Sequence, residues 1–122
     1  WVAKKQGAAQ AAAADDAKSF AIAELVTRGE QVYHANCAAC HQANGKGLPP
    51  AFPALEGSKL AKGPKAAHIA IVLHGKPNTA MAAYGGQLGD GDIAAVVTYE
   101  RNAWGNNTGD LVQPAEIRAA RK

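Results

Sequence analysis

The sequence predicts a small all-α domain, because three segments have the periodicity of amphipathic helices. Apolar residues recur at helical spacing in residues 23–36, 66–74 and 90–104, with polar residues between them. No β-rich run interrupts this pattern. Because the chain has 122 residues, we expect one domain at most, with a small core that needs additional apolar mass.

The N-terminal segment, residues 1–22, is predicted to be a linker. Residues 4–17 are mostly Ala, Gln, Lys, Asp and Gly, which offer little apolar surface to bury. The chain begins with Trp1 rather than Met, and it shows no secretory signal. We therefore expect the chain to be a piece of a longer protein, with Trp1 and Val2 at the end of a preceding domain.

The first predicted helix, residues 23–36, leads directly into a cysteine motif. The motif contains both cysteines of the chain and reads Cys37-Ala38-Ala39-Cys40-His41. C-x-x-C-H is the attachment sequence of a c-type haem, in which each thiol adds to one vinyl group of the porphyrin. The imidazole of His41 is then placed to bind the iron. The motif predicts covalent haem c, which would also supply apolar mass to a core with few aromatic residues.

Two other uses of the cysteines are less consistent with the sequence. A C-x-x-C pair can be a redox-active disulfide, but a thioredoxin-like site requires a βαβ pattern. A structural zinc site requires four ligands, and the candidates beyond the thiols are the four histidines at positions 34, 41, 68 and 74. The chain has no second C-x-x-C.

The segment after the motif, residues 42–58, is rich in Gly and Pro and is predicted to be a loop. The carbonyl of Pro53 is a candidate acceptor for the second N–H of His41, which would fix the orientation of the imidazole. Phe52 and Leu55 are candidates for packing on the porphyrin. The alternative is that the prolines simply punctuate the loop.

The second helix, residues 66–74, ends before Gly75 and precedes a glycine-rich loop, residues 78–89. This loop contains Met81, the only methionine, with Tyr84 nearby as a further candidate to contact the haem. We predict that the Met81 thioether is the second axial ligand of the iron. His68 and His74 are the rival ligands, and both are expected to be exposed polar residues.

The third helix, residues 90–104, has the clearest end signals. Gly89 is a candidate N-cap, and Asp90 and Asp92 suit the positive end of the helix dipole. Gly105 stands where a left-handed residue commonly ends a helix. The remaining residues, 106–122, are predicted to be a polar tail with one short helix after Pro114.

Charge and hydropathy argue against two classes of partner and suggest a third. The net charge is +3 with no arginine-rich run, so nucleic acid is not expected, and no apolar stretch is long enough to span a bilayer. Five lysines oppose only Glu56 between residues 46 and 81: Lys46, Lys59, Lys62, Lys65 and Lys76. They predict a basic collar that steers an acidic redox partner, or else a solvated surface.

The order of helix, C-x-x-C-H, Gly/Pro loop, short helix, methionine loop and last helix resembles a class I cytochrome c, over residues 25–104. The resemblance implies that the first and last helices cross near the haem, with His41 and Met81 as axial ligands. It also implies a proximal Pro-x-Leu element, which Pro53 and Leu55 match. Ala82 departs from the pattern, because many members have Pro directly after the ligand methionine.

Residues 75–81 and 92–106 are similar to the haem c domain fused to subunit II of some bacterial cytochrome c oxidases. This resemblance implies the end of a copper-binding domain and a linker in residues 1–22, a cytochrome domain in 23–105 and a tail in 106–122. It further implies electron relay from a donor cytochrome to the binuclear copper centre of that subunit, outside the bacterial cytoplasmic membrane, with the other oxidase subunits as partners. The domain itself would have no catalytic site.

Two alternatives to this relay stay open. A freestanding, diffusible periplasmic cytochrome c would share the fold and the redox role. A peroxidase or gas-binding module would instead keep the iron open, and Met81 would not bind it.

Overall fold

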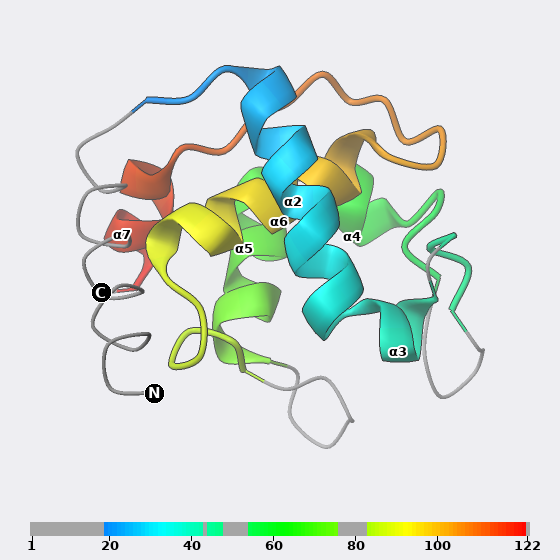
Figure 1. Cartoon of the computed structure of the whole chain (residues 1–122), viewed down its shortest axis with the longest axis horizontal. Helices are drawn as coiled ribbons and strands as arrows, with labels where there is room; N and C mark the ends of the chain where they lie inside the picture. Colours follow the sequence, from blue (N-terminus) through cyan, green and yellow to red (C-terminus); the bar gives the residue numbers. More distant parts are fainter. Residues whose placement is uncertain (1–18, 43, 48–53, 76–82, 122) are drawn as a thin grey trace.

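The computed structural model describes residues 19–42, 44–47, 54–75 and 83–121. Within these ranges the chain is helical and has no strand, which confirms the predicted all-α class. The helices are α2 (Ile22–Asn36), α3 (Ala38–His41), α4 (Lys59–Lys62), α5 (Lys65–His74), α6 (Asp90–Asn102) and α7 (Pro114–Ala120) (Figure 1). The three long helices match the segments predicted from periodicity, whereas α3 and α4 are single turns that periodicity cannot detect.

Helices α2 and α6 cross at the centre of the domain (Figure 1). At the crossing, Gly29 of α2 lies directly against the backbone of α6. A Cβ atom built on Gly29 would lie 2.1 Å from the carbonyl oxygen of Ala95 and 2.6 Å from the Cβ of Tyr99. No side chain fits in that space, so the close approach of the two helices requires glycine at this position.

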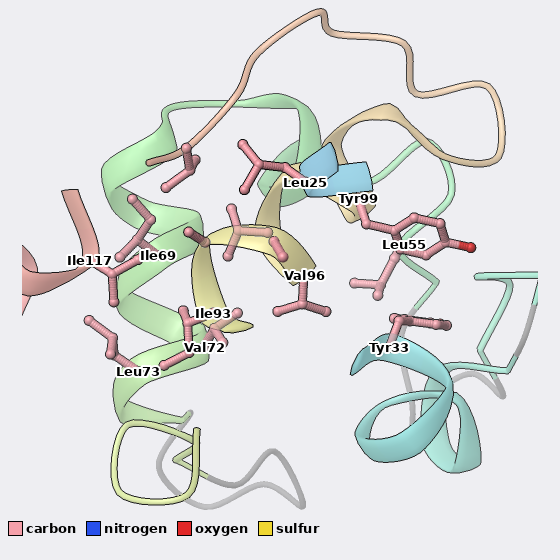
Figure 2. Packing of buried hydrophobic residues seen from close by; sticks show 14 residues of the cluster. Leu25, Tyr33, Leu55, Ile69, Val72, Leu73, Ile93, Val96, Tyr99 and Ile117 are labelled. Carbon is pink, nitrogen blue, oxygen red and sulfur yellow. The ribbon is translucent and has the colours of Figure 1, made fainter. Parts of the chain in front are cut away.

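The hydrophobic core lies between this helix pair and α5 and α7 (Figure 2). Leu25 from α2 and Ile93 and Val96 from α6 are almost completely buried. The other sides of the core are supplied by Ile69, Val72 and Leu73 of α5 and Ile117 of α7. Apolar residues on both sides of α6 are buried, so this helix occupies the centre of the domain.

The ends of α6 are as the sequence predicts. Gly89 is its N-cap, and Asp90 and Asp92 lie in its first turn. After α6 the chain turns at Trp104 and Gly105, which both have left-handed backbone, with φ of 56° and 87°. The left-handed conformation expected for Gly105 is therefore present, and Trp104 adopts it as well without the freedom of glycine.

The chain after Gly105 is packed against the rest of the domain. Val112 and Pro114 are buried beside α6, and the helix predicted after Pro114 is α7. The side chain of Gln113 forms two hydrogen bonds of 2.8 Å with the backbone of Phe20, which joins the two ends of the described fold. Residues 106–121 thus pack as part of the domain rather than as a separate tail.

The crossing gives a test of the fold. Replacing Gly29 by Ala forces α2 and α6 apart, and we expect a loss of about 2–3 kcal/mol in the free energy of unfolding, as for an overpacked core. The control is Gly86→Ala, because a Cβ at Gly86 would meet nothing within 4 Å. Urea denaturation followed by circular dichroism gives both values. Equal stability of the two variants would contradict the account of the crossing.

Candidate functional site

The cysteine motif lies at the end of α2, where the helix continues through Cys37 into α3. The amide of Cys37 donates to the carbonyl of Tyr33 at 2.8 Å, and the amide of His41 donates to the carbonyl of Cys37 at 3.0 Å. These helical bonds place positions 37, 40 and 41 within one turn, and positions three and four apart share a face of a helix. The side chains of Cys37 and His41 are half-buried, and that of Cys40 lies outside the described part.

This turn fits covalently attached haem. It offers two thiol-bearing positions three residues apart and an imidazole directly after the second, which is the donor set of a c-type haem. Over the described residues, no three His, Cys, Asp or Glu side chains come together as a metal site. The donors present are therefore those of haem attachment and proximal ligation.

Three hydrogen bonds hold the attachment turn at its two ends. At the end of α2, the Tyr84 hydroxyl donates to the carbonyl of Asn36 at 2.9 Å. At the end of α3, the Tyr33 hydroxyl donates to the carbonyl of Gln42 at 2.6 Å, and the amide of Gly47 donates to the carbonyl of His41 at 2.9 Å. The backbone of the motif is thus fixed by side chains and loops outside it.

An aromatic cluster packs behind the turn. The ring of Tyr33 lies 5.5 Å from that of Tyr99 and 5.0 Å from that of Trp104, and the last two are 5.4 Å apart. Gly45, in the loop after the motif, lies against the indole, since a Cβ there would be 2.5 Å from Trp104 Cδ2. The sequence marks Tyr33 only as an apolar helix residue, and the contact of Trp104 with the loop has no sequence signal.

Leu55, a predicted haem contact, is 8% exposed and belongs to the hydrophobic core. Its amide donates to the carbonyl of Gly45 at 2.7 Å. Asn106 fixes the same segment, because its Nδ2 donates to the carbonyl of Leu55 at 3.1 Å and its Oδ1 accepts from the amide of Gly57 at 2.7 Å. Asn106 is buried in what the sequence presents as a polar tail, so nothing in the pattern marks this role.

Phe52, Pro53 and Met81 lie outside the described residues. The part of the methionine loop that is described begins at residue 83 and is anchored on α5. The amide of Tyr84 donates to the carbonyl of Val72 at 2.9 Å, and that of Gly85 donates to the carbonyl of Leu73 at 3.0 Å. The half-buried Tyr84 therefore connects α5 with the end of α2, and its predicted contact with haem remains a prediction.

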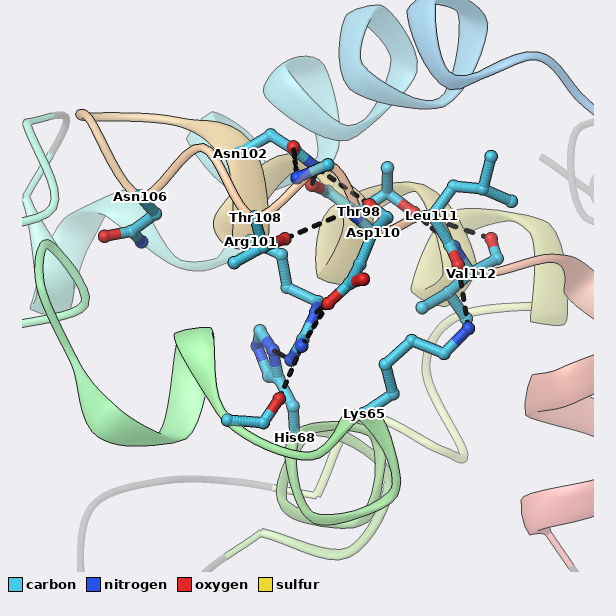
Figure 3. Close-up of polar contacts among 12 residues, drawn as sticks. Lys65, His68, Thr98, Arg101, Asn102, Asn106, Thr108, Asp110, Leu111 and Val112 are labelled. Atoms are coloured by element: carbon cyan, nitrogen blue, oxygen red, sulfur yellow. Dashed lines mark hydrogen bonds and ion pairs between the residues drawn. The ribbon is translucent and has the colours of Figure 1, made fainter.

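The expected exposure of His68 is wrong, because the residue is 1% exposed (Figure 3). Its Nε2 lies 2.7 Å from Oε1 of Glu100, and its Nδ1 lies 3.5 Å from Nη1 of Arg101. Helix α6 supplies both partners, which a reading of α5 alone cannot foresee. Both ring nitrogens face these groups, which disfavours His68 as an iron ligand, whereas His74 is exposed as predicted.

Arg101 is the centre of this buried polar network (Figure 3). Its guanidinium donates to the carbonyl of Gly63 and pairs with Asp110 at 2.6 Å. The hydrogen bond from Arg101 holds the pKa of the Asp110 carboxyl below its usual range, despite some opposing desolvation. The network ties α4, α5 and the segment before α7 to α6, and we assign it a structural role.

The network also changes the predicted basic collar. The ammonium of Lys65 pairs with Glu116 at 2.9 Å and donates to the carbonyl of Leu111 at 3.0 Å, so its charge is used within the fold. Lys46, Lys59 and Lys62 are exposed, and Lys76 lies outside the described residues. None of the helices in the described ranges is long and apolar enough to cross a bilayer.

Comparison with known proteins agrees with this site. The family model described as "Cytochrome C oxidase, cbb3-type, subunit III" matches residues 24–99. Cytochrome c-552 of Thermus thermophilus is 40% identical over 92 residues, which cover 64% of this chain and 69% of that protein. In the cytochrome c-552 sequence from a second strain of this organism, the match covers 61% of the length.

Two further relatives differ in size. The cytochrome c subunit of the quinone-dependent alcohol dehydrogenase of Gluconobacter oxydans is 31% identical over 103 residues, covering 76% of this chain but 22% of that subunit. Cytochrome c6 of Bumilleriopsis filiformis is 32% identical over 74 residues, covering 61% of this chain and 86% of that protein. The shared part is thus a single domain that occurs in shorter and longer proteins.

The helical fold and its C-x-x-C-H turn define a haem-binding electron carrier. The chain belongs to the cytochrome c family, to which the matching family model and the Thermus relative both assign it. It carries covalently attached haem c and transfers electrons, and the domain is not itself an enzyme.

The tyrosine behind the attachment turn predicts an alkaline weakness. Burial, with a further contribution from the Glu100 carboxylate, raises the pKa of Tyr33 well above its ordinary value of 10.0. Above pH 10 the unfolded chain releases the phenol proton while the folded chain keeps it, so stability falls as pH rises. Urea unfolding at pH 8 and pH 11 should show a smaller loss for Tyr33→Phe than for the wild type.

At pH 8, where the phenol is protonated in both states, Tyr33→Phe should cost about 1 kcal/mol for the lost hydrogen bond to Gln42. This value is the internal control for the alkaline measurement. An identical alkaline loss in the variant and the wild type would exclude Tyr33 as its source.

Proposed function

We propose that Cys37 and Cys40 carry the haem through two thioether bonds, with His41 and Met81 as its axial ligands. The observation that carries this proposal is the single helical turn that contains positions 37, 40 and 41. When bound, the haem iron supplies reversible one-electron chemistry between its ferrous and ferric states. The chain's own residues then hold the ligands and exclude water.

Each residue near the turn has a stated task in this proposal. Tyr33 and Tyr84 fix the ends of the attachment turn, so that the imidazole of His41 is presented in one position. Pro53 accepts the second N–H of that imidazole, and Phe52 and Leu55 cover the porphyrin. Burial of a charged iron site and thioether ligation both favour the reduced state and raise the reduction potential.

For the physiological role, we propose relay of electrons from a donor cytochrome to the binuclear copper centre of a cytochrome c oxidase subunit II. Support comes from the sequence resemblance of residues 75–81 and 92–106 to the haem c domain of such subunits. In this proposal residues 1–22 lead from the copper domain, and the site faces the periplasm.

A freestanding periplasmic carrier is the second candidate. It is favoured by the similarity to cytochrome c-552, since the matched domain makes up 69% of that protein. The sequence of the gene upstream of residue 1 separates the two candidates. A copper-binding motif there supports the oxidase relay, and an export signal followed directly by this domain supports the freestanding carrier.

Axial ligation by Met81 is tested by spectroscopy of the haem-loaded protein. The ferric wild type should show the near-infrared charge-transfer band of thioether-bound low-spin haem. Met81→Ala should remove the band, lower the reduction potential and allow carbon monoxide to bind the ferrous form, because the sixth position is then open. A second variant, Met81→His, should remain low-spin without the band.

Retention of the band in Met81→Ala would contradict the assignment. Ready binding of carbon monoxide by the ferrous wild type would instead favour the open-haem alternative, a peroxidase or gas-binding module. Both measurements use the same samples, so the two outcomes can be separated.

The exposed lysines of α4 are proposed to steer an acidic partner. Lys59 and Lys62 lie on one short helix beside the glycines at 57 and 63, and Lys46 is exposed in the loop after the motif. Like-signed surface charge mainly raises the association rate, and salt screens it over about 8 Å at physiological ionic strength. We expect the bimolecular rate of electron transfer with an acidic donor to fall as ionic strength rises.

Lys62→Glu should flatten this salt dependence. The matched control is Arg118→Glu, which makes the same change of charge on α7, at the opposite side of the molecule from α3 (Figure 1). Stopped-flow rates across a salt series measure both. Equal slopes for the two variants would show that the lysines of α4 do not face the donor.

A further inference from the structure

We propose that Arg121 is a positioning residue for the axial methionine, because it clamps the turn that follows Met81 onto the C-terminal helix. The inference rests on the proposed ligation by Met81. It goes beyond that proposal by assigning to α7 a part in holding the ligand on the iron.

The guanidinium of Arg121 contacts this turn at three points. Its Nε lies 2.5 Å from Oδ1 of Asp90, its Nη1 donates to the carbonyl of Gly85 at 2.5 Å, and its Nη2 donates to the carbonyl of Leu88 at 3.0 Å. Three nitrogens of one planar group thus bind the two carbonyls of the turn and the first residue of α6. A lysine ammonium cannot reach three such acceptors with fixed geometry.

Arg121 is presented from a fixed platform. Its amide donates to the carbonyl of Ile117 at 3.1 Å, and the Ile117 side chain is fully buried between α7 and the rest of the core. The N-terminal end of α7 is held in turn, since Pro114 is buried and Gln113 is bonded to Phe20. Movement of the turn away from Arg121 therefore breaks charge-assisted bonds rather than displacing a loose side chain.

The clamped turn is directly connected to the ligand. Tyr84 and Gly85 follow Met81 by three and four residues. When residues 84–88 are fixed, only a short piece of chain can move to take the sulfur from the iron, so the open state is less populated. Loss of the clamp should raise the population of this open state while the helical core stays intact.

The test uses the haem-loaded ferric protein with imidazole as the competing ligand. Imidazole binds only when the sixth position opens, so its apparent affinity reports the open population. Arg121→Ala should bind imidazole about tenfold more tightly than the wild type, as expected for lost bonds to a charged donor. Arg121→Lys should give an intermediate affinity, and Arg118→Ala, an exposed residue of the same helix, should match the wild type.

Urea titrations distinguish positioning from general stability. In Arg121→Ala the near-infrared band should disappear at a lower urea concentration than the helical circular dichroism, and the gap should exceed that of the wild type. If Arg121→Ala does not accumulate as folded protein, Arg121→Gln keeps most of the aliphatic stem and loses the three-point fork.

Three results would overturn the inference. Equal imidazole affinity in the Arg121 and Arg118 variants would exclude the clamp while leaving the ligation by Met81 intact. A band and a circular dichroism signal that disappear together would show that Arg121 only stabilises the fold. A wild type without the band would refute the ligation by Met81 itself, and the inference with it.

Discussion

The close crossing of α2 and α6 at Gly29 is the contact on which the rest of the domain depends. Because no side chain separates the two backbones, α2 is fixed in position and angle against the buried helix. The attachment turn is the continuation of α2, so its place relative to the core is set by the same contact. Removing the close approach would displace the haem-binding positions together with the helix.

The loops around the attachment turn are held by single side chains from distant parts of the chain. Tyr33 holds the segment after His41, Asn106 holds the segment that contains Leu55, and Arg121 holds the turn after Met81. Each of these residues donates to backbone carbonyls that have no partner in a helix. A domain with few regular elements can in this way present well-placed ligands from loops.

The sequence predicts the local features of this protein and misses those that depend on tertiary contacts. Helix positions follow from periodicity, and the haem motif follows from five adjacent residues, because both are local signals. The burial of His68 is not predictable in this way, since it depends on Glu100 and Arg101 arriving from another helix. The roles of Asn106 and Arg121 are hidden for the same reason: a polar residue in an apparently polar tail gives no sign that it is bonded across the fold.

The most direct test of the central claim is a peptide map of the haem-loaded protein. After proteolysis, mass spectrometry should find the peptide that contains residues 37–41 with the mass of one haem added, and no unmodified form of it. Fragmentation should place the haem on Cys37 and Cys40. An unmodified peptide with free thiols, accompanied by haem that separates from all peptides, would contradict the account.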